Sequence, residues 1–239
     1  MLAPEPRHQK TRLRHFLNAR FSAIGGYGRH LTIGLLVLAL ATWAFATIAE
    51  DVVTRGSLVT TDVVVTQWFQ LHTQPSLTRA MLYVTQLHGN LGIAAMTAIL
   101  CFFLYRRRHH FWALSLVSSV FGGMLLNALL KLIFQRPRPV VDHPLLTLAT
   151  HSFPSGHTMN ATVFYGIVAA FIVMQQRHIA CSLVAPLAAI LMIALVAISR
   201  VYLGVHFFSD VLASVAEGVA WLALCLTAMN IYYHRATKP

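Results

Sequence analysis

Charged residues are scarce in this chain of 239 residues, and acidic residues are the scarcest. Aspartate, glutamate, lysine and arginine make up 10% of the sequence, whereas a soluble domain carries about 25%. Only 7 residues are acidic, 57% are hydrophobic, and the mean hydropathy is +0.65. This composition excludes a soluble globular domain and predicts a polytopic membrane protein.

Ligands for a metal ion are also lacking. The 3 cysteines lie in separate apolar runs and do not have the spacing of a metal site. His109 and His110 are adjacent, so on a helix they would point to different faces. The few carboxylates form no cluster that could hold a metal. We therefore expect neither a metal nor another cofactor.

The positive charge of the chain does not follow the pattern of a nucleic-acid-binding protein. The formal net charge is +11, but the lysines and arginines gather at the ends of hydrophobic runs. No aromatic-basic recognition pattern accompanies them. We expect the membrane, and no nucleic acid, as a partner.

Hydrophobic runs predict an all-α fold with six transmembrane helices, since a span needs about 20 apolar residues. Residues 50–89 are too polar to span, and they are expected to form an interfacial helical segment between the first two spans or a folded extramembrane loop. One membrane domain over residues 31–233 would then lie between a basic arm, residues 1–30, and a tail, residues 234–239. The predicted spans are residues 31–49, 90–105, 111–134, 155–174, 180–198 and 207–232.

Basic residues on the two sides of these spans predict the orientation. The amino-terminal arm, residues 106–108, Arg177 and the carboxyl-terminal tail hold 12 of the 18 lysines and arginines. Short loops rich in Lys and Arg favour the cytoplasmic side. Both termini are therefore predicted to be cytoplasmic, and the loop over residues 135–153 and the turn before residue 207 to be outside.

Three polar segments reach this outer side, and the first holds Lys131 and Arg138. Basic residues at the end of a span usually extend to the lipid headgroups, and either residue alone would be read in that way. Pro137 and Pro139, however, stiffen the backbone around Arg138. They would help to present its guanidinium in a fixed direction.

The second segment is Pro154-Ser155-Gly156-His157, where the fourth span begins. Free backbone amides at a helix start form an anion site, and Gly156 has no side chain to obstruct the approach of a ligand. His157 alone would more often be a capping or surface residue.

The third segment runs from Ser199 to Asp210 and contains Arg200 and His206 in a short hairpin between two spans. If a helix begins near His206, Asp210 lies one turn on and on the same face. Its carboxylate can then hold one imidazole nitrogen and leave the other free to attack. Charges at membrane depth cost about 2.5 to 3.5 kcal/mol each on insertion scales. Three such segments on one side favour a functional site over unrelated surface residues.

Together the segments resemble the three-part signature of the type 2 phosphatidic acid phosphatase family, which includes vanadium haloperoxidases and glucose-6-phosphatase. The signature elements are Lys-x6-Arg-Pro at residues 131–139, Pro-Ser-Gly-His at 154–157 and Ser-Arg-x5-His-x3-Asp at 199–210. No signature position departs from the pattern. The six-span layout is similar to that of bacterial members that dephosphorylate phosphatidylglycerophosphate or undecaprenyl pyrophosphate, which implies a bacterial inner membrane.

The resemblance implies a role for each residue. His206 would be the nucleophile that forms a phosphohistidine, Asp210 its orienting partner and His157 the general acid. Phosphate would be bound by Lys131, Arg138, Ser155, Gly156 and Arg200. Fixed cations can neutralise the charge on the equatorial oxygens as metal ions do elsewhere, so the resemblance implies a metal-independent reaction.

Two features near the signature stay open at the level of the sequence. Arg136 is expected to be either a fourth phosphate or headgroup contact or a residue at the lipid surface. Headgroup selectivity is expected in residues 50–89 and in the loop over residues 139–152.

The sequence therefore predicts an integral membrane lipid phosphatase that acts at the outer face on phosphatidylglycerophosphate, undecaprenyl pyrophosphate or phosphatidic acid. The alternatives are a phosphotransferase that passes the phosphoryl group to a second lipid such as lipid A, and a lipid A phosphatase. Haloperoxidase chemistry fits six apolar spans less well. A transporter is disfavoured because, apart from Glu217, the charged residues gather at the ends of spans.

Overall fold

The computed structural model describes residues 26–141, 146, 150–175 and 178–236, and the basic arm predicted for residues 1–30 lies almost wholly outside them. Within the described residues every regular element is a helix. The helices are α2 (Gly26–Thr54), α3 (Ser57–Leu71), α4 (Pro75–Leu87), α5 (Asn90–Arg106), α6 (His110–Phe134), α7 (Gly156–Gln175), α8 (Ile179–Tyr202) and α9 (Phe208–Ala236).

Five of these helices, α2, α6, α7, α8 and α9, are long and apolar enough to cross a bilayer. The remaining predicted span corresponds to α5, which has 17 residues and reaches the required length only together with α4. The two are bent by 58° at the break between them, so they form either a broken span or a re-entrant pair. The all-α prediction is confirmed, with five to six spans.

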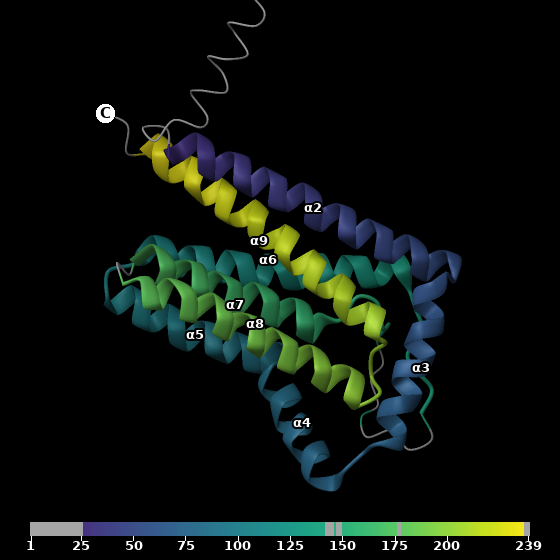
Figure 1. Cartoon of the computed structure of the whole chain (residues 1–239). Helices are drawn as coiled ribbons and strands as arrows, with labels where there is room; N and C mark the ends of the chain where they lie inside the picture. Colours follow the sequence, from purple (N-terminus) through teal and green to yellow (C-terminus); the bar gives the residue numbers. More distant parts are fainter. Residues whose placement is uncertain (1–25, 142–145, 147–149, 176–177, 237–239) are drawn as a thin grey trace, which may run out of the picture.

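The segment predicted between the first two spans is helical and consists of α3 and α4. In Figure 1, α3 runs beside the end of the molecule where α8 turns into α9. Tyr202 ties α4 to this turn, because its hydroxyl lies 3.0 Å from both the backbone nitrogen of Gln74 and Oγ1 of Thr78. Met81 of α4 packs in the same small core as Leu203 and Val205.

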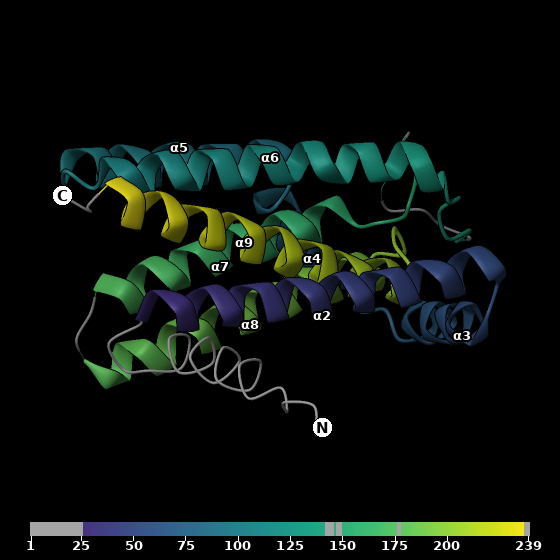
Figure 2. The ribbon, with the colours of Figure 1, turned by 90° about the horizontal axis from the view of Figure 1, so that it is seen from above.

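The main core lies where α5, α6 and α7 meet, with Ile93, Val120, Met159, Val163 and Ile167 among its buried members. Figures 1 and 2 show α2 running along α9 on one flank of this bundle. Large apolar side chains such as Leu36 and Trp43 of α2 are exposed. An apolar outer surface is what a bilayer requires of a spanning helix.

Local backbone geometry explains how the polar segments leave the spans. Helix α6 ends at Gln135, which has the left-handed φ of 45°, before the rigid sequence Pro137-Arg138-Pro139. Between α8 and α9 the chain turns at Gly204, whose φ is +66°. An added Cβ there would lie 2.8 Å from Cγ1 of Val141, so only glycine suits this turn. His206 follows it by two residues.

Candidate active site

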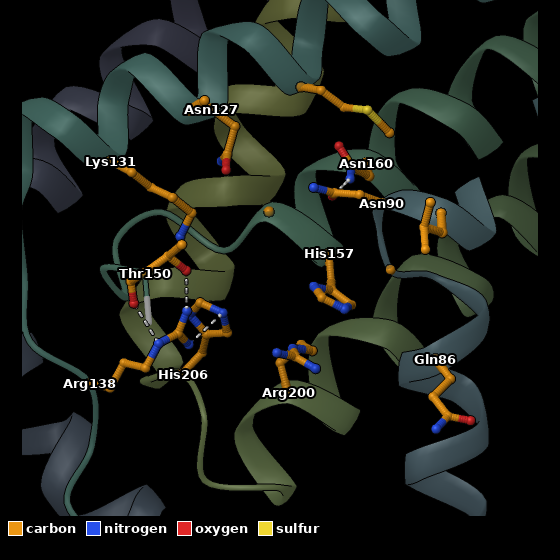
Figure 3. Close-up of a pocket in the computed structure, with 15 residues that line it drawn as sticks. Gln86, Asn90, Asn127, Lys131, Arg138, Thr150, His157, Asn160, Arg200 and His206 are labelled. Atoms are coloured by element: carbon orange, nitrogen blue, oxygen red, sulfur yellow. Dashed lines mark hydrogen bonds between the residues drawn. The ribbon is translucent and has the colours of Figure 1, made fainter. Parts of the chain in front are cut away.

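All three polar segments meet at one cavity of about 500 Å³ between the ends of the helices. Six of the eight predicted site residues line it (Figure 3): Lys131, Arg138, Gly156, His157, Arg200 and His206. Asp210 lies behind His206 and is fully buried. Ser155 is also fully buried and is not among the lining residues, and its Oγ accepts a hydrogen bond from Thr158. A direct phosphate contact by Ser155 therefore stays a prediction.

Backbone carbonyls, and not carboxylates, hold Lys131 and Arg138 in place. Nζ of Lys131 donates to the carbonyl of His151 at 2.8 Å. Arg138 donates from Nε to the carbonyl of Thr150 at 2.7 Å and from Nη1 to the carbonyl of Val205 at 2.6 Å. Their positive charges are thus fixed in direction but remain uncompensated, which suits an anionic ligand.

Arg200 brings a third cation to the cavity from the last turn of α8. Its side chain is 1% exposed and donates from Nη1 to Oγ1 of Thr85 on α4. Its Nε has no hydrogen-bond partner among the described residues. A buried guanidinium N–H without a partner is costly unless a ligand oxygen accepts from it. Within the same part of the chain, no carboxylate lies within 4.0 Å of Lys131, Arg138 or Arg200.

His206 and Asp210 confirm the geometry expected from their spacing. Nδ1 of His206 lies 3.3 Å from Oδ2 of Asp210, which also accepts from the backbone N–H of Phe207 at 2.9 Å. Nε2 of His206 lies 3.4 Å from Nη1 of Arg138 and faces the cavity (Figure 3). With the proton on Nδ1, the lone pair of Nε2 is directed at the space where the cations converge.

The surroundings of His206 keep its ring neutral. Burial comes first among the causes that lower its pKa well below the usual value, and the positive charges of Arg200, Lys131 and Arg138 act in the same direction. A neutral imidazole is the form that can attack phosphorus. The same cations that would bind phosphate therefore also maintain the nucleophile.

His157 projects into the cavity from the first turn of α7. An added Cβ at Gly89 would lie 3.5 Å from its Nε2, so the junction of α4 and α5 closely borders this ring. Gly156 is similarly restricted, since an added Cβ would lie 3.1 Å from Oδ1 of Asn127. A side chain at position 156 would therefore crowd Asn127, and an anion site at this helix start stays a prediction.

Arg136 has neither of the two roles expected from the sequence. It is not among the lining residues of the cavity, and its side chain is 10% exposed, so it does not lie at a lipid surface. Instead Nη1 lies 2.6 Å from Oδ1 of Asp210, and Nη2 lies 2.7 Å from Oδ2 of Asp62. Asp62 had no assigned role in the sequence. The available signal was that a rare acid within an apolar helix needs a partner.

Four uncharged amides form another part of the wall, and the sequence did not single them out. Asn160 donates from Nδ2 to Oδ1 of Asn90 at 3.1 Å, and Asn127 donates from Nδ2 to Oε2 of the buried Glu217 at 2.9 Å. Gln86, near the end of α4, lines the same cavity (Figure 3). Gln86 falls within the residues where selectivity was expected, whereas the three asparagines do not.

Metal binding finds no support in the described residues, where no group of three or more His, Cys, Asp or Glu side chains could hold an ion. The cavity carries its charge on lysine and arginine. This arrangement can bind a tetrahedral anion and place a neutral imidazole against it.

Comparison with known proteins shows similarity to one family of membrane phosphatases. The model of the PAP2 superfamily matches residues 112–233, which include all three polar segments. Phosphatidylglycerophosphatase B of Bacillus subtilis is 37% identical over 151 residues, which cover 61% of this chain and 72% of that protein. Undecaprenyl-diphosphatase BcrC of the same organism is 31% identical, and lipid A 1-phosphatase of Rhizobium johnstonii is 35% identical. The chain spans 48% and 44% of their lengths, respectively.

Solved structures extend the similarity to the fold. The crystal structure of a transmembrane PAP2-type phosphatidylglycerolphosphate phosphatase from Bacillus subtilis superposes with a TM-score of 0.74 at 28% identity. The match covers 84% of this chain and 97% of that one. The crystal structure of Aquifex aeolicus LpxE has the same fold, with a TM-score of 0.57 at 23% identity. This match covers 69% of this chain and 93% of LpxE.

The lowered pKa of His206 predicts how the residue reacts as the pH falls. Diethyl pyrocarbonate modifies only neutral imidazole, and ordinary histidine becomes protonated near about pH 6.5. We expect the rate of His206 modification to stay constant through that pH, while the rate for N-acetylhistidine in the same detergent solution halves. Mass spectrometry of the His206 peptide gives the rate, and inorganic phosphate should protect the residue by filling the cavity. A midpoint at or above that of N-acetylhistidine would contradict the neutral resting state.

Proposed function

As a member of the PAP2 superfamily, the chain is a membrane phosphatase that acts on lipid phosphates, and we propose that it transfers the phosphoryl group to His206 before water releases it. The observation that carries this proposal is the convergence of three cations, unpaired with carboxylates in the described residues, on Nε2 of a neutral histidine. Phosphoryl transfer requires mainly such positioning and charge stabilisation.

The first half-reaction follows from this geometry. Lys131, Arg138 and Arg200 bind the phosphate oxygens, with help from the amides at the start of α7. Nε2 of His206 forms a bond to phosphorus while the bond from phosphorus to the leaving oxygen breaks. His157, which is protonated once the bound phosphate offsets the positive charge of the cations, gives its proton to that oxygen. The ring of His206 then carries a positive charge, which Asp210 stabilises through Nδ1–H.

In the second half-reaction, neutral His157 takes a proton from water as the oxygen of that water attacks phosphorus. The bond between phosphorus and Nε2 breaks, so inorganic phosphate and neutral His206 are formed. His157 ends protonated, ready for the next substrate. Each group thereby returns to its starting state without any further reactant.

The uncharged end of the cavity supports a monoester substrate over a pyrophosphate. An in-line displacement places the leaving group opposite His206, beyond His157. The amides of Gln86, Asn90 and Asn160 lie on that side (Figure 3). Neutral amides can bind hydroxyl and ester oxygens, but they do not neutralise a second phosphate. We therefore favour a lipid phosphate monoester such as phosphatidylglycerophosphate, the substrate in the name of the relative that is 37% identical.

The spans and the bacterial relatives identify a bacterial membrane protein. The charge distribution supports a placement of the cavity at the outer face of the inner membrane, with both termini in the cytoplasm. In the described part of the chain, Arg106, Arg107 and Arg108 between α5 and α6 lie at the opposite end of α6 from Lys131. A lipid phosphate in the outer leaflet could then enter the cavity sideways from the bilayer.

The two histidines should fail in different ways when replaced. We expect His206→Ala to abolish turnover and the covalent intermediate, because no neighbouring group can replace the nucleophile. His157→Ala should lose about 10²- to 10⁴-fold with a lipid substrate. It should recover part of this rate with a nitrophenyl phosphate, whose leaving oxygen needs no proton. Rapid quenching with labelled substrate, without acid, measures acid-labile phosphate on the protein. Label retained in His206→Ala, or found on His157, would reverse the assignment.

Substrate preference tests the uncharged end of the cavity. In the presence of EDTA, we expect phosphate release from phosphatidylglycerophosphate or phosphatidic acid with a kcat/KM at least about ten-fold above that for undecaprenyl pyrophosphate, a difference of about 1.4 kcal/mol. Gln86→Lys should narrow this ratio by adding a cation beside the leaving group. The matched control Gln67→Lys should not narrow the ratio, because Gln67 is exposed on α3 and lies outside the cavity. A preference for pyrophosphate would exclude this substrate assignment, and phosphate recovered on a second lipid would exclude water as the acceptor.

Accessibility of introduced cysteines tests the side of the membrane. In a variant whose three native cysteines are replaced by alanine, Val140→Cys should react with an impermeant thiol reagent added outside intact cells, because Val140 is 96% exposed beside the cavity loop. Arg108→Cys, which is exposed at the other end of α6, should react only after the cells are permeabilised. The opposite pattern would place the cavity on the cytoplasmic side.

A further inference from the structure

Asp62 forms a buried connection between helix α3 and the residues behind the nucleophile. Its side chain is fully buried, although α3 lies outside the residues that match the family model and outside all three signature segments. Oδ1 accepts from the backbone N–H of Ser209 at 2.7 Å. Oδ2 accepts from Oγ of Ser209 at 2.5 Å and from Nη2 of Arg136 at 2.7 Å. Both carboxylate oxygens are therefore occupied by fixed donors.

Arg136 stands between two carboxylates. Nη2 reaches Asp62, and Nη1 donates to Oδ1 of Asp210 at 2.6 Å and to Oγ of Ser209 at 2.8 Å. The guanidinium also lies 4.2 Å from the centre of the Phe207 ring. A planar guanidinium held on two edges and one face has a single orientation. Because Arg136 contacts only Oδ1 of Asp210, Oδ2 of Asp210 is available to Nδ1 of His206.

From these contacts we propose that Asp62 is a positioning residue for phosphoryl transfer. By sharing the charge of Arg136, Asp62 keeps the negative charge of Asp210 available to His206. This inference rests on His206 as the nucleophile proposed above. Asp62 itself does not touch the cavity and acts through Arg136 and Asp210.

Charge balance explains why a second carboxylate is needed. Arg136 and Asp210 alone would form a neutral pair, and most of the field of Asp210 would be cancelled at His206. With Asp62, the group of three carries one net negative charge in a buried setting. That negative charge stabilises the positive charge that appears on the His206 ring when phosphorus bonds to Nε2. These three residues therefore stabilise the transition state, in which the ring becomes charged, more than the resting enzyme, in which it is neutral.

The test compares Asp62→Asn with Asp51→Asn. Asp62→Asn keeps the shape and removes the charge. Its one side-chain oxygen can still accept hydrogen bonds, while its amide nitrogen, itself a donor, faces one of the donors that Asp62 accepts from. Asp51 is the matched control, because its Oδ2 accepts from the backbone N–H of Leu58 at 2.8 Å and holds the start of α3 without touching the network. We expect Asp62→Asn to lower kcat by about 10- to 100-fold, as loss of an outer partner typically does. KM should change by less than about two-fold, and Asp51→Asn should retain kcat.

A double-mutant cycle separates positioning from a merely structural role. If Asp62 acts through Asp210, adding Asp62→Asn to Asp210→Asn should lower kcat no further, because the charge that Asp62 protects is already gone. Additive losses, or a loss below about two-fold in Asp62→Asn alone, would overturn the proposal. Should Asp62→Asn fail to fold in detergent, Arg136→Lys provides the second variant. It keeps the charge but cannot bridge two carboxylates, and it too should lower kcat without adding to Asp210→Asn.

Rapid-quench labelling distinguishes the failure of this inference from the failure of the proposed function. Slower formation of phosphohistidine in Asp62→Asn, with unchanged formation in Asp51→Asn, is the expected result. Normal formation in Asp62→Asn would refute its positioning role while leaving the nucleophile intact. A wild-type protein that forms no phosphohistidine would instead refute the intermediate, and the kinetic cycle would still decide whether Asp62 and Asp210 are coupled.

Discussion

Buried positive charge without a neighbouring carboxylate is the constraint on which this structure depends. Lys131, Arg138 and Arg200 converge on one cavity, and cations in a poorly solvated site repel one another unless an anion joins them. Their positions are therefore maintained by the fold: backbone carbonyls at residues 150, 151 and 205 hold two of them, and Thr85 of α4 holds the third. In the proposed function, phosphate supplies the negative charge that these cations lack, which is the condition for strong and specific anion recognition.

The proposed reaction also needs negative charge to support His206, and the carboxylates that carry this charge must be kept away from the phosphate. The structure resolves this conflict by distance and burial, since Asp210 and Asp62 lie behind His206 and are fully buried. Arg136, the remaining cation of the loop, faces the carboxylates and not the cavity. Burial and the cations in front lower the pKa of His206 at rest, and we propose that the carboxylates behind it stabilise the charge on its ring once phosphorus is bound.

The sequence predicted contacts between residues that are close in the chain better than contacts between distant ones. Arg200, His206 and Asp210 are close in the chain, so helical spacing alone places the imidazole over the carboxylate, and the structure confirms this. Arg136 and Asp62 are 74 positions apart, and their pairing depends on how α3 packs across the turn between α8 and α9. Spacing cannot reveal such a contact. The asparagines of the cavity wall were also missed, because an uncharged polar residue on a spanning helix produces no clear signal in hydropathy or charge.

The cavity is built from more of the chain than the part that matches the family model. The three signature segments and the cations lie within residues 112–233, the part that matches the family model. Thr85, which holds Arg200, comes from α4, before that part begins. Two of the four wall amides, Gln86 and Asn90, also come from α4 and the start of α5, whereas Asn127 and Asn160 lie within the matched part. Asp62 comes from α3. Changes in α3, α4 and α5 can therefore alter what is bound beyond His157, or how well His206 is supported, while the phosphate site stays the same.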